Sequence, residues 1–76
     1  MTVARSLFNR LSPQCRKIVS HMERVGHITN DAAITYYRIM ALPRRIADLK
    51  AAGIEVQAER VKHPTTGQRY VRYSLT

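Results

Sequence analysis

The chain of 76 residues carries 13 lysine and arginine residues against 5 aspartate and glutamate residues, for a formal charge of +8 at pH 7. A chain this short buries only about 60% of the surface that its unfolded form exposes, so it has room for one small core and not for an enzyme with its own cofactor pocket. Its hydrophobic content of 45% is ordinary for a folded domain and too high for a disordered basic tail. We therefore expect one folded, basic domain without a cofactor.

The sequence shows no mark of export or of membrane insertion. Cys15 is the one cysteine, so the chain cannot form an internal disulfide, and it contains no apolar run of about 18 residues or more. Residues 1–11 lack the apolar core and the cleavage site of a secretory signal. These features predict a cytoplasmic protein without a membrane partner.

The positive charge is spread along the chain rather than gathered in a tail. Acidic residues occur only from Glu23 to Glu59, so the stretches before and after are purely basic. Ten of the 13 basic residues are arginine, whose forked guanidinium suits phosphates and guanine edges. This excess favours a polyanionic partner, most commonly nucleic acid, over a basic protein that is merely soluble.

The first third of the chain predicts two helical stretches. Ser12 suits the N-cap of a helix, Pro13 its first position and Gly26 its end. The apolar side of this helix consists of Cys15, Ile18, Val19, Met22 and Val25. A shorter apolar stripe before it consists of Val3, Leu7, Phe8 and Leu11. We expect residues 1–11 to form a short helical segment that docks on the domain or mediates dimerisation, and residues 12–76 to form the domain.

Two more helices are predicted between Gly26 and Gly53. Residues 27–29 are long enough only for an edge strand, and Asn30-Asp31 suits the cap and acidic first turn of a helix that runs to about residue 37. The inward positions of that helix are Ala33, Ile34 and Tyr37. After a turn over residues 38–42, Pro43 suits the first position of a third helix. Its buried side consists of Leu42, Ile46 and Leu49, and its other side of Arg44, Ala47, Asp48 and Ala51.

The apolar period changes from helical to alternating after Gly53. Two strands are predicted, with inward positions Ile54, Val56 and Ala58 in the first and Val71, Tyr73 and Leu75 in the second. The turn-forming residues 63–68 lie between them. The sequence therefore predicts a C-terminal β-hairpin with a basic tip region.

The element order is helix, short strand, helix, turn, helix, strand, loop, strand, which is that of a winged helix-turn-helix. The residues that carry the pattern are Ile28-Thr29, Ala33, Tyr37, Ile39, Arg45-Ile46, Asp48-Leu49, Gly53-Ile54 and residues 71–75. Over about residues 14–75 the chain resembles the small winged helix-turn-helix domains common in bacteriophage and prophage genomes. It departs from them at Ala41-Leu42-Pro43, where a small polar cap is expected. The resemblance implies an α+β fold with a three-helix core, a hairpin wing and a short additional edge strand.

The third helix carries the first group of candidate DNA contacts. Arg44 is our first choice for a base contact, because side chains near the start of such a helix reach the base edges of the major groove. For Arg45 a DNA contact and a surface role, covering the core or paired with Asp48 or Glu55, are equal alternatives. Lys50, farther along the helix, is expected to contact the DNA backbone.

The second and third groups lie in the preceding turn and on the wing. Tyr36 and Arg38 are expected to contact phosphates, with a partly buried ring as the alternative for Tyr36. Lys62, Arg69 and Arg72, together with Arg60 and His63, make the wing basic. Such a wing lies along the DNA backbone or inserts an arginine into a narrow minor groove, and the alternative is that its charges only protect the strand edges.

Metal and catalytic sites are not predicted. Cys15, His21 and His27 are spaced six residues apart, which puts them on different helical faces, and Cys15 is expected to be a buried thiol. Glu55 and Glu59 most simply keep one strand face soluble. No P-loop, His-Glu-x-x-His or Gly-x-Ser-x-Gly motif is present. The chain is therefore not expected to be an enzyme.

These features lead to one hypothesis and two alternatives. The hypothesis is a phage-derived protein that binds double-stranded DNA through the third helix and the wing, as a transcriptional regulator in the cytoplasm of a bacterial host. The alternatives are an accessory protein of excision or recombination, and a module that inhibits a host protein such as RNA polymerase. One recognition helix reads about four to six base pairs, so a homodimer is a further expectation.

Overall fold

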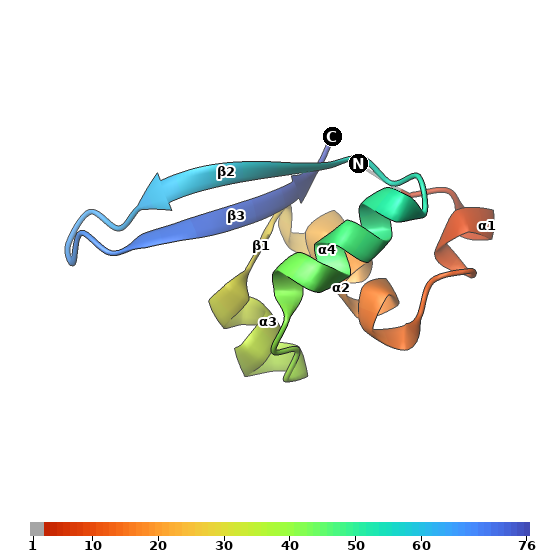
Figure 1. The fold of residues 1–76 in the computed structure, drawn as a ribbon, viewed down its shortest axis with the longest axis horizontal. Coiled ribbons are helices and arrows are strands. Elements are labelled where there is room, and N and C mark those ends of the chain that lie inside the picture. The colour runs from red at the N-terminus through yellow and green to blue at the C-terminus, as the bar shows by residue number, and fades with distance from the viewer. Residues whose placement is uncertain (1–2) are drawn as a thin grey trace.

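The computed structural model describes residues 3–76. Its helices lie beneath a three-stranded antiparallel sheet, and the outer part of the hairpin extends well beyond them (Figure 1). The elements are α1 (Arg5–Phe8), α2 (Pro13–Val25), β1 (Ile28–Thr29), α3 (Asn30–Tyr37), α4 (Leu42–Ala51), β2 (Val56–Lys62) and β3 (Arg69–Leu75). The α+β winged helix-turn-helix fold predicted from the sequence is confirmed.

Helix α2 begins and ends where the sequence predicts. The Ser12 hydroxyl accepts a hydrogen bond from the Cys15 N–H at 3.3 Å, Pro13 is the first helical residue, and Gly26 ends the helix with φ at 102°. The expected burial is wrong at Val25, which is 49% exposed because the chain turns away directly after it. His21 is buried instead, on the side of α2 that Tyr37 of α3 covers.

The caps of α3 and α4 differ from the predicted ones. Thr29, the last residue of β1, caps α3 by accepting a hydrogen bond from the Ala32 N–H at 3.2 Å, so Asn30 is already helical. Helix α4 begins at Leu42, which makes Pro43 its second residue. The fully buried Leu42 side chain anchors this first turn, and the N-cap Ala41 gives no side-chain hydrogen bond. This helix start therefore has no polar side-chain cap, as Ala41 in the sequence indicates.

The end of α4 and its exit toward the sheet follow from Gly53. Gly53 adopts φ of 94°, a backbone region that glycine enters without strain. Its N–H donates to the Lys50 carbonyl at 3.0 Å, and the Ile54 N–H donates to the Leu49 carbonyl at 3.0 Å. This pair of hydrogen bonds is the Schellman motif, and the buried Ile54 completes it.

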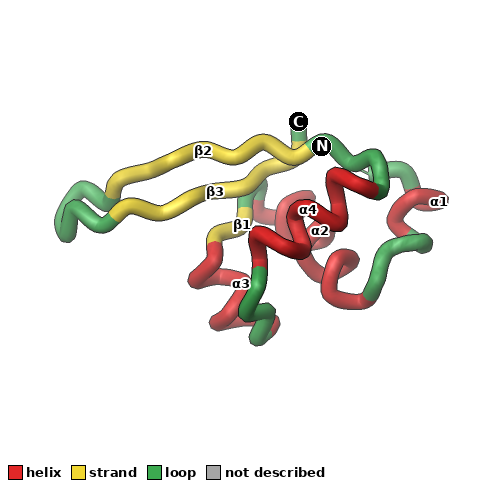
Figure 2. The backbone as a smooth tube through the Cα atoms, in the orientation of Figure 1, coloured by secondary structure: helices red, strands yellow, loops and turns green. Residues whose placement is uncertain are grey.

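The sheet has the order β1-β3-β2, with Ile28 of β1 opposite Tyr73 and the β2–β3 ladder running from Val56–Leu75 to Lys62–Arg69. The tube in Figure 2 shows that β1 covers only a short part of β3. The predicted inward face of β2 holds for Val56, which is buried, and is wrong for Ala58, which is exposed. The reason is the overhang of the hairpin, which leaves most of β2 without helices beneath it.

One core joins the helices to the base of the sheet. The fully buried large side chains are Ile18, Val19, Met22, Ile28, Ile39, Leu42 and Leu49. Val3, Leu7 and Phe8 of the N-terminal segment pack against this core. The Val3 N–H also donates to the Glu23 carboxylate at 2.7 Å, which ties the start of the described chain to α2.

Candidate nucleic-acid interface

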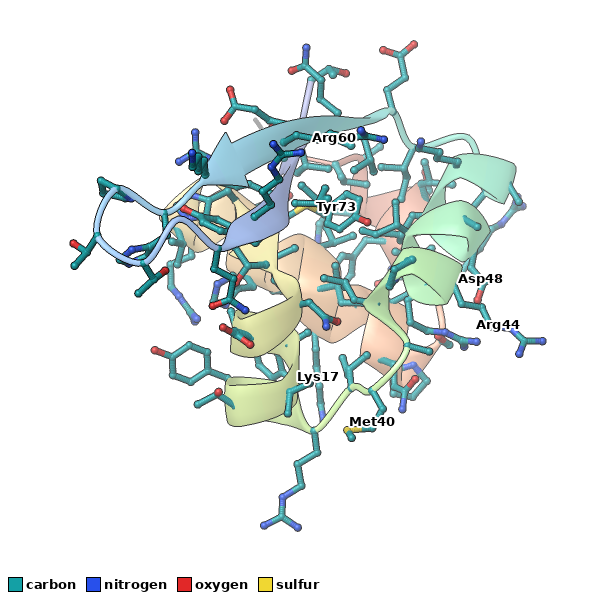
Figure 3. All side chains as sticks on the ribbon, turned by 60° about the vertical axis from the view of Figure 1, so that its left-hand side comes forward. Lys17, Met40, Arg44, Asp48, Arg60 and Tyr73 are labelled. Carbon is teal, nitrogen blue, oxygen red and sulfur yellow. The ribbon has the colours of Figure 1, made fainter. Side chains whose placement is uncertain are left out.

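The exposed face of α4 carries Arg44 in its first turn. Because successive helical residues are turned by about 100°, Arg44, Ala47, Asp48 and Ala51 share a side, opposite the buried Leu42, Ile46 and Leu49. Figure 3 shows Arg44 extending from α4 away from the other elements, with Asp48 on the same side. Within residues 3–76, the Arg44 guanidinium has no ion pair or hydrogen bond. The start of α4 therefore presents an uncompensated charge.

Helix α4 lies between α2 and the wing. On one flank the Arg45 carbonyl lies 4.0 Å from the Cys15 Sγ of α2. On the other flank Pro43 lines a groove of about 560 Å³ together with wing residues, among them His63, Gln68 and Arg69. Arg44 lies about 100° from each of these flanks, so its face is turned outward between them. Cys15 itself is buried, as predicted.

Arg45 is engaged within its own helix. Its guanidinium lies 3.3 Å from the Asp48 carboxylate, with side chains 27% and 51% exposed. Of the roles that the sequence left open, the structure shows the pair with Asp48. The Asp48 carboxylate therefore has its ion-pair partner in Arg45 and not in Arg44.

The turn between α3 and α4 holds Arg38 in a left-handed conformation, with φ of 56°. Such a value is uncommon for a residue other than glycine, and the surroundings maintain it here. The Arg38 N–H donates to the Ile34 carbonyl at 2.9 Å, the Ile39 N–H donates to the Ala33 carbonyl at 3.1 Å, and the Ile39 side chain is buried. The Arg38 side chain is exposed and so is Tyr36, at 68%.

Tyr37 is linked to α2 through a contact that the sequence analysis missed. Its hydroxyl lies 2.9 Å from His21 Nδ1, and Arg24 donates to the same hydroxyl at 3.5 Å. The two rings meet edge to face at 5.6 Å. Burial, followed by the charge of Arg24 and then that of His27, lowers the pKa of His21 below its ordinary value of 6.5. The only signal for this His21–Tyr37 contact in the sequence was the position of His21, a polar residue within one turn of the apolar stripe of α2.

The wing separates its cations between two faces. Cross-strand partners share a face, so Arg60, Lys62 and Arg69 lie on the side of Val71 and Tyr73, which is the side of the helices. Lys62 and Arg69 are directly opposite each other, and both are exposed. Arg72 lies on the other face and forms an ion pair with Glu59 across the two strands.

The predicted contacts therefore fall into two sets in the described part of the chain. Arg45 and Arg72 are paired with carboxylates. The others are exposed and have no carboxylate partner: Arg44, Tyr36, Arg38, Lys50, Lys62 and Arg69. Lys50 follows Arg44 by six residues, which turns it about 240° round α4, so it borders the loop at Gly53 rather than sharing the Arg44 face.

Residues 3–76 contain neither a metal-binding cluster nor a membrane-spanning helix. No cluster of three or more His, Cys, Asp or Glu side chains there is arranged to hold a metal ion. No helix in this range has the length and apolar character needed to cross a membrane.

Comparison with known proteins identifies the architecture. A family model described as a winged helix-turn-helix domain matches residues 13–76, nearly the whole chain. This match confirms the winged helix-turn-helix resemblance inferred from the residues over about 14–75. Neither the curated proteins nor the solved structures give a match.

Proposed function

Because the chain belongs to the winged helix-turn-helix family, a type of DNA-binding domain, we propose that it binds duplex DNA with α4 in the major groove and the wing on the neighbouring backbone or minor groove. The observation that carries this proposal is the uncompensated Arg44 at the outward start of α4. An α-helix fits the major groove, and its first residues reach the base edges.

The exposed face of α4 has side chains suited to reading bases. Arg44 can form two hydrogen bonds with a guanine edge, and Asp48 can accept one from a cytosine amino group. Ala47 and Ala51 are small, so the helix can approach closely and contact thymine methyl groups. The ion pair with Arg45 orients Asp48 for its contact before DNA arrives.

The remaining cations are proposed to contact phosphates, which position the protein without choosing a sequence. Arg38 and Tyr36 serve the turn before α4, Lys50 the far end of α4, and Lys62 with Arg69 the wing. Arg45 and Arg72 contribute less, since each must exchange a carboxylate for a phosphate.

The test is selection from random duplex DNA, followed by gel-shift titration at several salt concentrations. Neutralising about four to six phosphates gives a slope of log K against log salt of about −4 to −5. Arg44→Ala is expected to lose about 1 to 3 kcal/mol and the preference at one base pair. Arg10→Ala is the matched control, because it removes the same charge from an exposed position outside the interface. A flat salt response, or equal effects of the two variants, would contradict the proposal.

We further propose that the cellular role is that of a phage or prophage regulator of transcription in a bacterial host, with an accessory role in excision or recombination as the alternative.

The small size of the chain supports a homodimer, because the single recognition helix of one copy covers few base pairs. The side chains of Val3, Leu7, Phe8 and Leu11 already belong to the core or pack against it, which leaves less of this apolar stripe for pairing. This packing supports treating residues 12–76 as the domain on which the N-terminal segment docks. Sedimentation of the full chain with and without its selected DNA tests the dimer.

One observation favours a second candidate function. Met40 and Tyr36 are 74% and 68% exposed, two residues from Arg38 on either side in the sequence, and a phosphate contact would use the Tyr36 hydroxyl but neither its ring nor Met40. Exposed apolar surface of this kind is found at protein interfaces. The second candidate is therefore an inhibitor of a host protein such as RNA polymerase. A host protein that is retained by the wild type and released by Met40→Ser, in a chain that shifts no DNA, would establish it.

A further inference from the structure

The tip of the wing, residues 63–68, is closed by hydrogen bonds that converge on His63. The His63 N–H donates to the Gln68 carbonyl at 2.8 Å, and the Gly67 N–H donates to the His63 carbonyl at 2.9 Å. The backbone nitrogens of Thr65 and Thr66 lie 3.2 and 3.3 Å from the imidazole Nδ1. His63 thus contributes its N–H, its carbonyl and one ring nitrogen to the same turn.

The two side-chain contacts determine which ring nitrogen carries the proton. A backbone N–H can only donate, so Nδ1 of His63 is the acceptor and bears no proton. In the neutral ring the proton is then on Nε2, on the side away from the turn. No hydrogen bond within residues 3–76 uses Nε2, and the residue is exposed. The tip therefore presents an oriented N–H donor with no partner in this part of the chain.

His63 is placed among the cations of the wing. It directly follows Lys62, whose cross-strand partner is Arg69, and it lines the groove between the wing and Pro43 at the start of α4. Lys62 and Arg69 attract any phosphate through their charge, whereas a neutral donor needs an acceptor in line with it, either a phosphate oxygen or a base edge. Only a contact from His63 to a base edge would affect sequence preference.

We infer, on the basis of the proposed function, that the Nε2–H of His63 donates a hydrogen bond into the minor groove and makes the wing prefer A·T pairs. The minor-groove edge of an A·T pair offers only acceptors, adenine N3 and thymine O2. A G·C pair adds the guanine amino group, which is itself a donor and opposes the His63 N–H. Because the tip is already ordered by its own hydrogen bonds, the contact requires little further ordering.

Substitution with asparagine separates the roles of the two ring nitrogens. In His63→Asn the Oδ1 atom takes the place of Nδ1 and accepts from the N–H groups two and three residues later, as in an Asx turn. The Asn Nδ2 donor takes the place of Cδ2, one bond short of the Nε2 position. His63→Ala loses both functions. Thr65→Ala is the matched control at the tip, because the backbone N–H that donates to His63 remains. Each full-length variant is titrated with two duplexes that differ only in having A·T or G·C pairs at the flank that the wing contacts.

We expect His63→Asn to reduce the preference for the A·T duplex by about three- to tenfold, the size of one neutral hydrogen bond. The base preference at α4 and the behaviour of Thr65→Ala should not change. Equal loss on both duplexes would indicate a phosphate contact and overturn the inference, and so would an unchanged preference. If the wild type binds no DNA, the proposed function fails together with this inference. If the wild type binds DNA and the His63 variants keep its preference for the A·T duplex, the inference alone fails.

Nitrogen-15 NMR of the free protein tests the donor without DNA. We expect the neutral His63 ring to show an unprotonated Nδ1 and a protonated Nε2. The Thr65 and Thr66 amides should exchange with solvent at similar rates in the wild type and in His63→Asn, and faster in His63→Ala. A neutral ring protonated at Nδ1 would contradict the inference.

Discussion

Helix α4 and the wing are both proposed to meet DNA, but they are built in different ways. Helix α4 is anchored by three buried side chains, Leu42, Ile46 and Leu49, and exposes only its outer face. The outer part of the wing has no buried side chain, and backbone hydrogen bonds hold its shape. The structure therefore couples α4 to the stability of the whole fold, whereas the wing can change with little effect on that stability.

The largest expected effect tests this coupling. Leu49→Ala removes a fully buried side chain and should lower the free energy of unfolding by about 2 to 5 kcal/mol. Val61→Ala on the wing should cost less than about 1 kcal/mol, because the side chain is only half-buried. Urea denaturation measures both, and Ile46→Val gives a smaller core change of about 0.5 to 1.5 kcal/mol if Leu49→Ala does not fold. Similar decreases in the free energy of unfolding for the core and wing variants would contradict the proposed difference between α4 and the wing.

The next effect distinguishes base recognition from phosphate contact at constant charge. Arg44→Lys keeps the charge but loses the guanidinium fork, so it should lose base preference by about 1 to 3 kcal/mol at one position. Arg69→Lys on the wing should bind nearly as the wild type does, since a phosphate accepts either cation. Binding-site selection with both variants gives the result. A loss of preference in Arg69→Lys as large as that in Arg44→Lys would remove the distinction.

A smaller effect concerns the two faces of the wing. Lys62→Ala should reduce the steepness of the salt dependence by about 0.9, the contribution of one phosphate. Arg72→Ala should reduce it less, because Glu59 already neutralises Arg72 in the free protein. Titrations at four salt concentrations measure both slopes. Equal reductions would mean that the Arg72–Glu59 pair opens on DNA.

The smallest expected effect concerns the pH dependence of stability, through His21 of α2, which is buried against Tyr37. The pKa of His21 is lowered in the folded protein, so as the pH falls the unfolded chain takes up this proton first. Below about pH 6.5 His21 should therefore lower the free energy of unfolding, until the folded-state pKa is also passed. Urea denaturation between pH 7.5 and 5.5 should show this decrease in the wild type relative to His21→Gln. Parallel pH profiles for the two proteins would contradict it.

Much of the fold was predictable because its determinants are local. The Ser12-Pro13 start of α2, the left-handed glycines at its end and at the end of α4, and the change of period after Gly53 each act within a few residues. The exposure of Arg44, Lys62 and Arg69, which are proposed to contact DNA, was also predictable, because it follows from their positions on these elements. The caps of α3 and α4 were misplaced by one residue, because a strand leads directly into α3 and a buried leucine begins α4.

The sequence by itself determined the element order, the winged helix-turn-helix fold and the excess of positive charge. Only the tertiary structure decided which cations stay free, since Arg45 and Arg72 find Asp48 and Glu59 while Arg44 finds no carboxylate in the described chain. It also decided that His21 is buried against Tyr37, that Ala58 is exposed and that His63 presents its Nε2–H. Caps and periodicity depend on neighbours in the chain, whereas burial, ion pairs and tautomers depend on which atoms the fold brings within a few ångströms.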